Sequence, residues 1–324
     1  MKLPTWSALA LLVATAGCAA PDRGATDALP DDGFVDVRGL RAAYRVIGSG
    51  PGVPVILIHG GPGSTSCGFA NALDALPATR PVVIYDQVGS GFSSRIPSDR
   101  LPEFTDFGRF LEEIDALRAE LGLDEVHLVG SSWGSAVALE YLLEGNATGV
   151  QSVSFVGPYF STQRWIADTG PLVETLSDSA QVAVAQAVAS GDFSDPAFAA
   201  ADAEFMANYG VRTPADQRDP GACDLQPEGN SGLYEFMWGP SEFVSTGTLR
   251  GYDRIARLSE LQLPVLFVRG EFDEPSVETV LEYQSMVPGS RFETIAGAGH
   301  GVYVDDPVAF NRVILEFLES TTGG

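Results

Sequence analysis

The stretch EVHLVGSSWGSAVALEYLL, residues 125–143, decides the fold. Residues 125–130 form a short and almost continuous apolar run, which is typical of a buried strand in a parallel sheet. Residues 135–143 have the pattern of a helix. A strand, then Gly-x-Ser-x-Gly, then a helix indicate a sharp turn that presents a nucleophilic serine.

The serine at the centre of this turn is Ser132. It lies between Gly130 and Gly134, and small residues there allow the strand and helix backbones to come close to it. The neighbouring Ser131 is the alternative nucleophile. We assign the role to Ser132 because it holds the central position.

Strand and helix patterns alternate along the rest of the chain. Apolar runs predict further strands at residues 53–59, 81–86, 150–156, 263–269 and 291–295, and helical spacing predicts helices at 104–121, 277–286 and 308–318. Between residues 160 and 245 only helical stretches are evident, at 172–189 and 195–206. This pattern predicts an α/β fold with a doubly wound, mostly parallel sheet and an inserted helical cap. We assign residues 34–159 and 246–324 to the core and residues 160–245 to the cap.

The N-terminus has the pattern of an export signal. Residues 1–18 begin with the basic Lys2 and contain an apolar run that is too short to span a bilayer. They end in Thr15-Ala-Gly-Cys18, which resembles the lipidation site of bacterial lipoproteins. We expect Cys18 to be lipidated and residues 19–33 to be a flexible tether. The protein would then be exported and lipid-anchored to the bacterial cell envelope, on the periplasmic or outer-membrane face; an ordinary cleaved secretory signal is the alternative.

Composition argues against several classes of partner. The 324-residue chain is 45% hydrophobic and 19% charged, so it has material for a large core, and its net charge of −24 disfavours nucleic acid. We expect membrane contact only through the lipid anchor. The three histidines and three cysteines have no metal-ligand spacing, so neither a metal nor another cofactor is expected. A disulfide between Cys67 and Cys223 is permitted in an exported protein, and the sequence leaves it open.

A nucleophilic serine needs a general base, and the base needs an orienting carboxylate. His300 follows the last predicted strand, where this fold delivers its base, whereas His127 lies within a strand and His59 in a glycine-rich loop. A surface-loop histidine is the plain alternative for His300. The chain order Ser…Asp…His places the carboxylate in the loop that follows residues 263–269, and we assign it to Asp273. Glu271 and Glu274 are the competing acids.

Acyl transfer also needs N–H donors for the negatively charged oxygen that develops during the reaction. We expect one from the glycine-rich loop after the first buried strand, at Gly61, and the other from Trp133, directly after the nucleophile. No Gly-Lys-Ser/Thr follows the glycine-rich loop, which argues against phosphate binding there.

Four strings in order resemble the proline iminopeptidases, α/β-hydrolases that remove N-terminal residues, preferentially proline. They are His59-Gly-Gly-Pro-Gly63, Asp86-Gln-Val-Gly-Ser-Gly-Phe-Ser93, Gly130-Ser-Ser-Trp-Gly134, and Met237 to Asp253 with its central Gly-Pro-Ser-Glu242. The last string is similar to the cap segment of the tricorn-interacting aminopeptidase branch. The resemblance covers about residues 34–320 and is weakest between 160 and 230.

The resemblance implies that Glu242 and Glu274 bind the free α-amino group of the substrate. Buried carboxylates suit this task because a blocked N-terminus would leave them unpaired. Alternatives are a helix-capping or packing role for Glu242 and a solvated position for Glu274. Family members are commonly intracellular, whereas this chain begins like a lipoprotein, which bears on the substrate more than on the chemistry.

We therefore predict a serine aminopeptidase that acts through Ser132, His300 and Asp273 on peptides or small amides with a free N-terminus. Tyr234, Phe236 or Trp238 of the cap are candidates to pack the pyrrolidine ring. One alternative is an esterase or broad amide hydrolase on the same fold, and a second is a non-catalytic surface lipoprotein. Haloalkane dehalogenases and epoxide hydrolases are excluded because they place Asp at the nucleophile position. The oligomeric state stays open.

Overall fold

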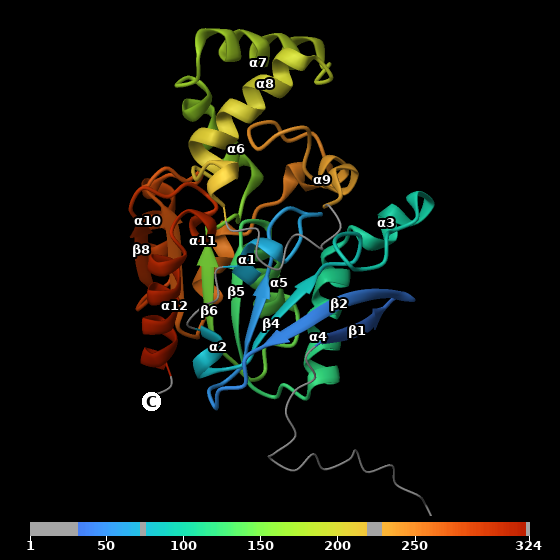
Figure 1. Ribbon diagram of the computed structural model, residues 1–324, viewed down its shortest axis with the longest axis vertical. Helices are drawn as coiled ribbons and strands as arrows, with labels where there is room; N and C mark the ends of the chain where they lie inside the picture. Colours follow the sequence, from blue (N-terminus) through green and yellow to red (C-terminus); the bar gives the residue numbers. More distant parts are fainter. Residues whose placement is uncertain (1–31, 72–75, 219–228, 322–324) are drawn as a thin grey trace, which may run out of the picture.

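The computed structural model describes residues 32–71, 76–218 and 229–321. One sheet of eight strands, in the order β1-β2-β4-β3-β5-β6-β7-β8, forms its centre (Figure 1). The strands are β1 (Asp32–Val37), β2 (Leu40–Ile47), β3 (Val55–Ile58), β4 (Val82–Asp86), β5 (Val126–Ser131), β6 (Val150–Val156), β7 (Val265–Gly270) and β8 (Arg291–Ile295). From β4 to β8 all neighbours are parallel. The predicted α/β fold with a mostly parallel sheet is confirmed.

The first two strands are not among the predicted runs. β1 and β2 form an antiparallel hairpin, and β2 also pairs antiparallel with β4. In β1 the buried Val35 and Val37 alternate with the exposed Phe34 and Asp36, so no continuous apolar run marks this edge strand. β1 begins at Asp32, two residues before the predicted start of the core at residue 34.

Helices cover both faces of the sheet. One apolar cluster joins the sheet to α3 (Leu101–Phe104), α4 (Phe107–Leu121), α5 (Trp133–Glu144) and α10 (Val277–Met286). A second cluster joins it to α1 (Cys67–Asn71), α2 (Leu76–Thr79), α11 (Val302–Asp305) and α12 (Pro307–Thr321). Full burial of each large apolar side chain in these clusters stabilises the fold by about 1.5–3 kcal/mol.

Local signals set the ends of the longer helices. The Asp106 side chain accepts a hydrogen bond from Arg109 N at the start of α4, and Gly122, with φ +63°, ends it. Helix α5 begins directly after Ser132. The turn between β5 and α5 therefore places the predicted nucleophile at a helix N-terminus.

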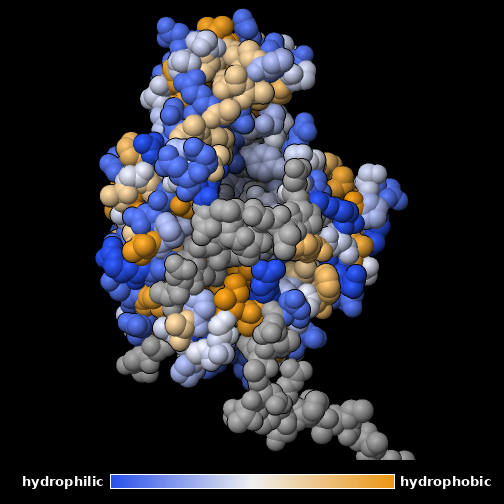
Figure 2. Space-filling model, viewed as in Figure 1, coloured by the Kyte–Doolittle hydropathy of each residue, from blue (hydrophilic) through white to orange (hydrophobic). Residues whose placement is uncertain are grey.

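The insertion between β6 and β7 forms a helical cap over the carboxyl ends of the strands (Figure 1). Its helices are α6 (Thr162–Val173), α7 (Asp178–Ser190), α8 (Pro196–Phe205), a π-helical turn (Met206–Gly210) and α9 (Ser231–Met237). The same insertion contains short 3-10 helices at Ala215–Gln217, Thr248–Gly251 and Ile255–Glu260. Another 3-10 helix, Ser98–Arg100, lies outside it and directly precedes α3. Helices α7 and α8 project from the molecule (Figure 1), and some apolar surface is visible on this projection (Figure 2). Val182 and Val188 of α7 are exposed.

The predicted continuous helical stretch at 172–189 is wrong. Helix α6 ends at Val173, and α7 begins at Asp178. Ser177 separates the two because its hydroxyl accepts a hydrogen bond from Ala180 N and so caps the new helix.

The predicted signal at residues 1–18, its lipidation site Cys18 and all but the last two residues of the tether lie outside the described residues. Within the described ranges, no helix combines the length and the apolar character needed to cross a membrane. Cys67 is disulfide-bonded, and Cys223 lies outside the described residues.

Candidate active site

Ser132 occupies a strained turn between β5 and α5. Its φ of 53° and ψ of −121° lie in a region that side-chain-bearing residues rarely adopt. Ser132 N donates to Val156 O at 2.8 Å, which fixes the turn against β6. Ser131, in contrast, is the last residue of β5 and is 1% exposed. The turn therefore presents Ser132, not Ser131, to the space beneath the cap.

The two flanking glycines allow this turn to form. A Cβ atom on Gly130 would lie 2.3 Å from Gly134 O, and one on Gly134 would lie 2.1 Å from Ile58 O. Any larger residue at either position would push α5 away from β5 or β3. The spacing Gly-x-Ser-x-Gly is thus a packing requirement of the strand–turn–helix unit.

His300 and Asp273 come together at the carboxyl edge of the sheet. His300 follows β8, and its Nδ1–H donates to Asp273 Oδ1 at 2.6 Å. Asp273 follows β7, and it also accepts hydrogen bonds from Gly270 N at 3.0 Å and from Glu274 N at 2.8 Å. Because Nδ1 carries the proton, Nε2 of a neutral His300 is free to accept one.

The competing histidines and acids are held elsewhere. His59 is 2% exposed, and its Nε2 accepts a hydrogen bond from Gln87 N. His127 is fully buried in β5 beside Ser152. The exposed Glu271 accepts a hydrogen bond from Gly297 N. None of these three is positioned to serve Ser132.

His300 Nε2 is buried and has no hydrogen-bond partner within the described part of the chain. The Trp165 ring packs edge-on against the imidazole at 5.3 Å. Catalytic hydrogen bonds are often long or poorly aligned in unliganded enzymes and tighten around the substrate. An unpartnered Nε2 is therefore compatible with a base that waits for the Ser132 proton.

Gly61 and Trp133 line the same pocket as Ser132. The φ of +109° at Gly61 favours glycine, and a Cβ there would lie 2.7 Å from Ser64 N. Among the described residues, no acceptor is found for the backbone N–H of Gly61 or Trp133. Both groups are therefore available to hold an oxyanion beside Ser132.

Two glutamates lie beside this catalytic group. Glu274 is 1% exposed, its Oε2 lies 3.6 Å from His300 Nδ1, and neither of its carboxylate oxygens has a hydrogen-bond partner in the described ranges. Glu242 is half-buried and lines the pocket with Ser132. Burial raises the pKa of both carboxyl groups, well above the ordinary value for Glu274.

The charge on these acids acts on the base. Burial alone would lower the pKa of His300, but the carboxylates of Glu274 and Asp273 outweigh it and raise that pKa from 6.5 to about 10. A cation bound by the glutamates would weaken this effect. The site therefore couples the protonation of its base to the charge of what it binds.

A third carboxylate, Asp202 of α8, was not among the predicted residues. It shares a helix face with Phe198 and Phe205, both of which pack against Phe243, next to Glu242. Burial and the charge of Glu242 raise its pKa to about 6. Only the packing of α8 on the segment around Glu242 reveals this residue; its local sequence is an ordinary helix.

The pocket beside Ser132 has an aromatic wall. Tyr159, Trp165 and Trp238 pack against one another at steep angles, with ring centroids 5.5–6.2 Å apart. Together with Leu249 they line a narrow pocket with a cavity volume of about 10 Å³. Of the cap aromatics named from the sequence, Trp238 lines this pocket.

The other two named aromatics do not line it. Phe236 is partly exposed on α9. Burial raises the pKa of the Tyr234 hydroxyl, and so does the Glu242 carboxylate, with which the hydroxyl interacts. Tyr234 therefore lies with Glu242 and not in the aromatic wall. Tyr159 and Trp165 were not predicted because they follow β6, outside the motifs quoted from the sequence.

Comparisons with known proteins identify the family. A model of the α/β-hydrolase fold matches residues 53–307. The proline iminopeptidase of Heyndrickxia coagulans is 37% identical over 292 residues, which cover 89% of this chain and 99% of that protein. The chain belongs to the proline iminopeptidase family.

Further comparisons support this membership. The proline iminopeptidase of Levilactobacillus brevis is 34% identical over 88% of this chain and 95% of its own length. The crystal structure of the Mycobacterium smegmatis proline iminopeptidase, 27% identical, superposes with a TM-score of 0.77 over 90% of this chain and 98% of that one. As a proline iminopeptidase homologue, the chain is a serine hydrolase of the α/β-hydrolase fold.

Proposed function

We propose that this protein is a serine aminopeptidase that releases an N-terminal residue, preferentially proline, from peptides or small amides through an acyl-enzyme. Ser132, His300 and Asp273 form the catalytic triad in this proposal. Gly61 and Trp133 supply the oxyanion donors, and Glu242 and Glu274 bind the α-amino group. Placement in the tricorn-interacting branch stays a prediction that rests on the sequence around Glu242.

The observation that carries the proposal is the buried carboxylate of Glu274, which accepts no hydrogen bond from the described residues. A buried carboxylate that accepts no hydrogen bond is costly, so such a group favours a cationic ligand or takes up a proton. The Glu274 side chain is 1% exposed and lies next to the base, and Glu242 lines the pocket that holds Ser132. A substrate ammonium between the two glutamates would bring the first peptide carbonyl to the nucleophile.

Each step of the reaction has a residue for it. His300 Nε2 takes the Ser132 proton while Oγ attacks the carbonyl carbon, and the N–H groups of Gly61 and Trp133 hold the oxyanion. His300 then gives the proton to the leaving amine, and the C–N bond breaks. Water, activated by His300, hydrolyses the aminoacyl ester and restores Ser132.

The aromatic wall supports a preference for proline. The pyrrolidine ring is compact and apolar, and the pocket beside Ser132 is narrow and walled by the side chains of Trp165, Trp238 and Leu249. Small apolar pockets discriminate by about 1–3 kcal/mol per methylene. A short ring that fills the pocket and keeps its amine on the glutamates would be favoured over longer side chains.

Three substrates test the proposal on purified protein that lacks the first 18 residues. They are L-prolyl β-naphthylamide, its N-acetylated form and p-nitrophenyl butyrate. We expect fast turnover of the first, loss of turnover on acetylation, and no turnover of any substrate by Ser132→Ala. Glu274→Gln and Glu242→Gln should raise KM for the prolyl substrate, whereas Glu271→Gln, on the exposed side of the same loop, should not.

Other outcomes would replace the proposal. Preferred cleavage of the butyrate, or indifference to acetylation, would indicate an esterase or a broad amide hydrolase. Absence of Ser132-dependent turnover of all three would favour the non-catalytic lipoprotein.

We also propose that the protein is exported and lipid-anchored through Cys18. The support is the apolar run of residues 8–16, whose end overlaps the segment Thr15-Ala-Gly-Cys18. Metabolic labelling of the full chain in a bacterial host with an alkyne fatty acid tests this. Labelled wild-type protein in the membrane fraction and unlabelled Cys18→Ser are expected; equal labelling of both would reject the proposal.

A further inference from the structure

Gln87 lies between the two segments that present the oxyanion donors. It follows β4 directly and is 1% exposed. Its side-chain Nε2–H donates to His59 O at 3.0 Å, and its Oε1 accepts a hydrogen bond from Trp133 Nε1–H at 3.1 Å. One amide group thus joins the residue that precedes the Gly60-Gly61 loop to the residue that follows the nucleophile.

The backbone of Gln87 adds a second connection to the same loop. Gln87 N–H donates to His59 Nε2 at 3.0 Å, which requires the proton of His59 to be on Nδ1, where it is donated to Gly60 O at 2.8 Å. Burial lowers the pKa of His59, so the neutral ring is favoured. His59 and Gln87 therefore fix the start of the loop that carries Gly61.

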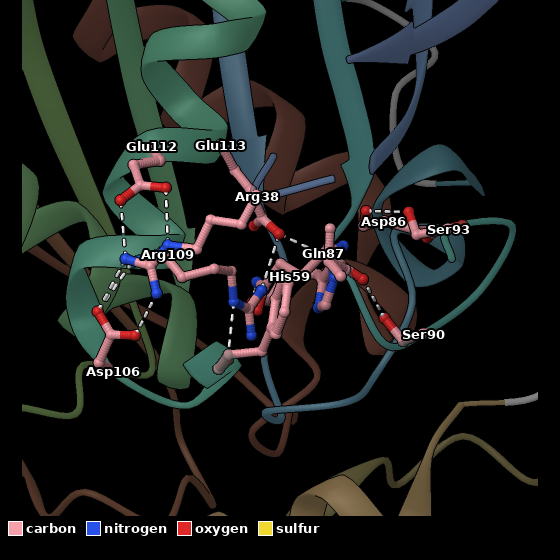
Figure 3. Close-up of polar contacts among 12 residues, drawn as sticks. Arg38, His59, Asp86, Gln87, Ser90, Ser93, Asp106, Arg109, Glu112 and Glu113 are labelled. Atoms are coloured by element: carbon pink, nitrogen blue, oxygen red, sulfur yellow. Dashed lines mark hydrogen bonds and ion pairs between the residues drawn. The ribbon is translucent and has the colours of Figure 1, made fainter. Parts of the chain in front are cut away.

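A buried ion pair holds Gln87 from the opposite side. Val88 N–H, the next donor along the chain, donates to Glu113 Oε1 at 2.7 Å, and that oxygen also accepts a hydrogen bond from Arg109 Nη1 at 2.8 Å. Both charged side chains are 0% exposed. Figure 3 shows Gln87 against His59, with Arg109 and Glu113 next to them. The backbone on either side of Gln87 is thereby fixed.

From this arrangement we infer that Gln87 is a positioning residue for the oxyanion hole. It holds the N–H groups of Gly61 and Trp133 at the separation that an oxyanion on the Ser132 adduct requires. The inference rests on the proposed function for the identity of the substrate. Because the donors act on the charge that develops in the transition state, Gln87 would affect kcat and not ground-state binding.

The amide of Gln87 is matched to this task. It needs one donor for the His59 carbonyl and one acceptor for the Trp133 indole, and the Gln amide offers them on two separate atoms at the end of the side chain. Gln87→Met keeps length and volume but loses both groups. Gln87→Glu keeps the acceptor but turns a carboxylate oxygen towards the His59 carbonyl.

The test measures kcat, KM and the affinities of two inhibitors for the purified wild-type and variant enzymes. L-Prolinal forms a tetrahedral adduct with the serine and needs the oxyanion donors, whereas the product L-proline does not. For Gln87→Met we expect kcat and prolinal affinity to fall together by about 10- to 100-fold, since loss of one complete donor costs about 10²–10³. KM and proline affinity should stay within about 2-fold. Gln284→Met, on α10 and outside the pocket, is the matched control and should behave as wild type.

A double-mutant cycle with Trp133→Phe isolates the Gln87–Trp133 bond. Trp133→Phe removes the indole N–H and keeps the ring and the backbone donor. If the two residues act through one bond, the double variant loses no more kcat than Gln87→Met alone. If Gln87→Met does not fold, Gln87→Glu takes its place in the cycle.

Two results would overturn the inference. One is a folded Gln87→Met variant with wild-type kcat and prolinal affinity. The other is an equal loss of proline and prolinal affinity, which would indicate general collapse of the pocket. If the wild type cleaves only p-nitrophenyl butyrate, the proposed aminopeptidase function fails, and the mutant cycle is run on that ester because the same oxyanion donors act on it. Failure of the proposed function is thus distinguishable from failure of this inference.

Discussion

His300 Nδ1 lies 2.6 Å from Asp273 Oδ1 and 3.6 Å from Glu274 Oε2, so the base of this enzyme contacts an amine-binding candidate as well as its own orienting acid. Removal of a negative neighbour lowers the pKa of an imidazole. The arrival of a substrate ammonium at Glu274 has the same sign of effect. Substrate binding therefore favours the neutral, proton-accepting His300.

The first prediction concerns the pH profile of Glu274→Gln. The carboxylates raise the pKa of His300 to about 10 against the effect of burial. Without the Glu274 charge that pKa falls, so Ser132 becomes reactive at lower pH. The measurement is the rate at which diisopropyl fluorophosphate, a neutral reagent, labels the serine as a function of pH.

The control for this shift is Glu271→Gln. Glu271 is an exposed acid three residues before Glu274 in the same loop, and its side chain accepts a hydrogen bond from Gly297 N. The acid limb of the pH profile of serine labelling in Glu271→Gln should remain close to that of the wild type. Superimposable profiles for wild type and Glu274→Gln would show that Glu274 does not act on His300.

The second prediction concerns Asp202→Asn. The pKa of Asp202 is raised to about 6 by burial and by Glu242. Above that pH the carboxylate is charged and attracts the substrate ammonium, so KM for L-prolyl β-naphthylamide should fall as pH rises from 5 to 7. In Asp202→Asn this fall should shrink and KM at neutral pH should rise by about 3- to 10-fold, of the order expected for one partly screened charge.

For the Asp202 experiment, Asp178→Asn on the exposed start of α7 serves as the matched control. An unchanged KM profile in Asp202→Asn would remove this residue from the amine site. A fall in kcat with constant KM would likewise contradict a role in binding the ammonium.

The third prediction concerns pocket size. Leu249 is 6% exposed and lines the pocket with Trp238 and Trp165. Leu249→Ala should lower kcat/KM for the prolyl substrate by about 10-fold or more, because the pyrrolidine no longer fills the space, and should raise relative turnover of leucyl β-naphthylamide. Leu281→Ala, 47% exposed on α10, should change neither. A preserved proline preference in Leu249→Ala would place specificity elsewhere.

The parts of the fold that local patterns mark were predictable. Strands β3, β4, β5 and β7 are buried on both faces and so appear as nearly continuous apolar runs. The Ser132 turn needs the flanking glycines Gly130 and Gly134, which are evident in the sequence. The edge strand β1 buries only alternate residues and escaped notice. The break between α6 and α7 depends on the single cap Ser177 within a uniformly helical composition.

The candidate site divides in the same way. Ser132, Asp273 and His300 lie at strand ends in a fixed chain order, so position along the sequence suffices to name them. Asp202 is one of 43 acids and becomes visible only when α8 packs on Phe243. Gln87 stands in a motif quoted from the sequence, but its contacts with His59 and Trp133 join three separate segments.

The last prediction concerns the stability of the buried pair beneath Gln87. Arg109 and Glu113 are both 0% exposed, four residues apart on α4. Arg109→Met leaves Glu113 buried and unpaired, so the free energy of unfolding should fall by about 3–5 kcal/mol. Arg312→Met removes the exposed pair with Glu316, which has the same spacing on α12, and should cost about 0–1 kcal/mol. Urea unfolding followed by tryptophan fluorescence measures both. Equal losses of unfolding free energy in the two variants would mean that burial does not govern the energy of these pairs. If Arg109→Met loses more unfolding free energy and also has a reduced kcat, the result would link the ion pair through Val88 and Gln87 to the oxyanion hole.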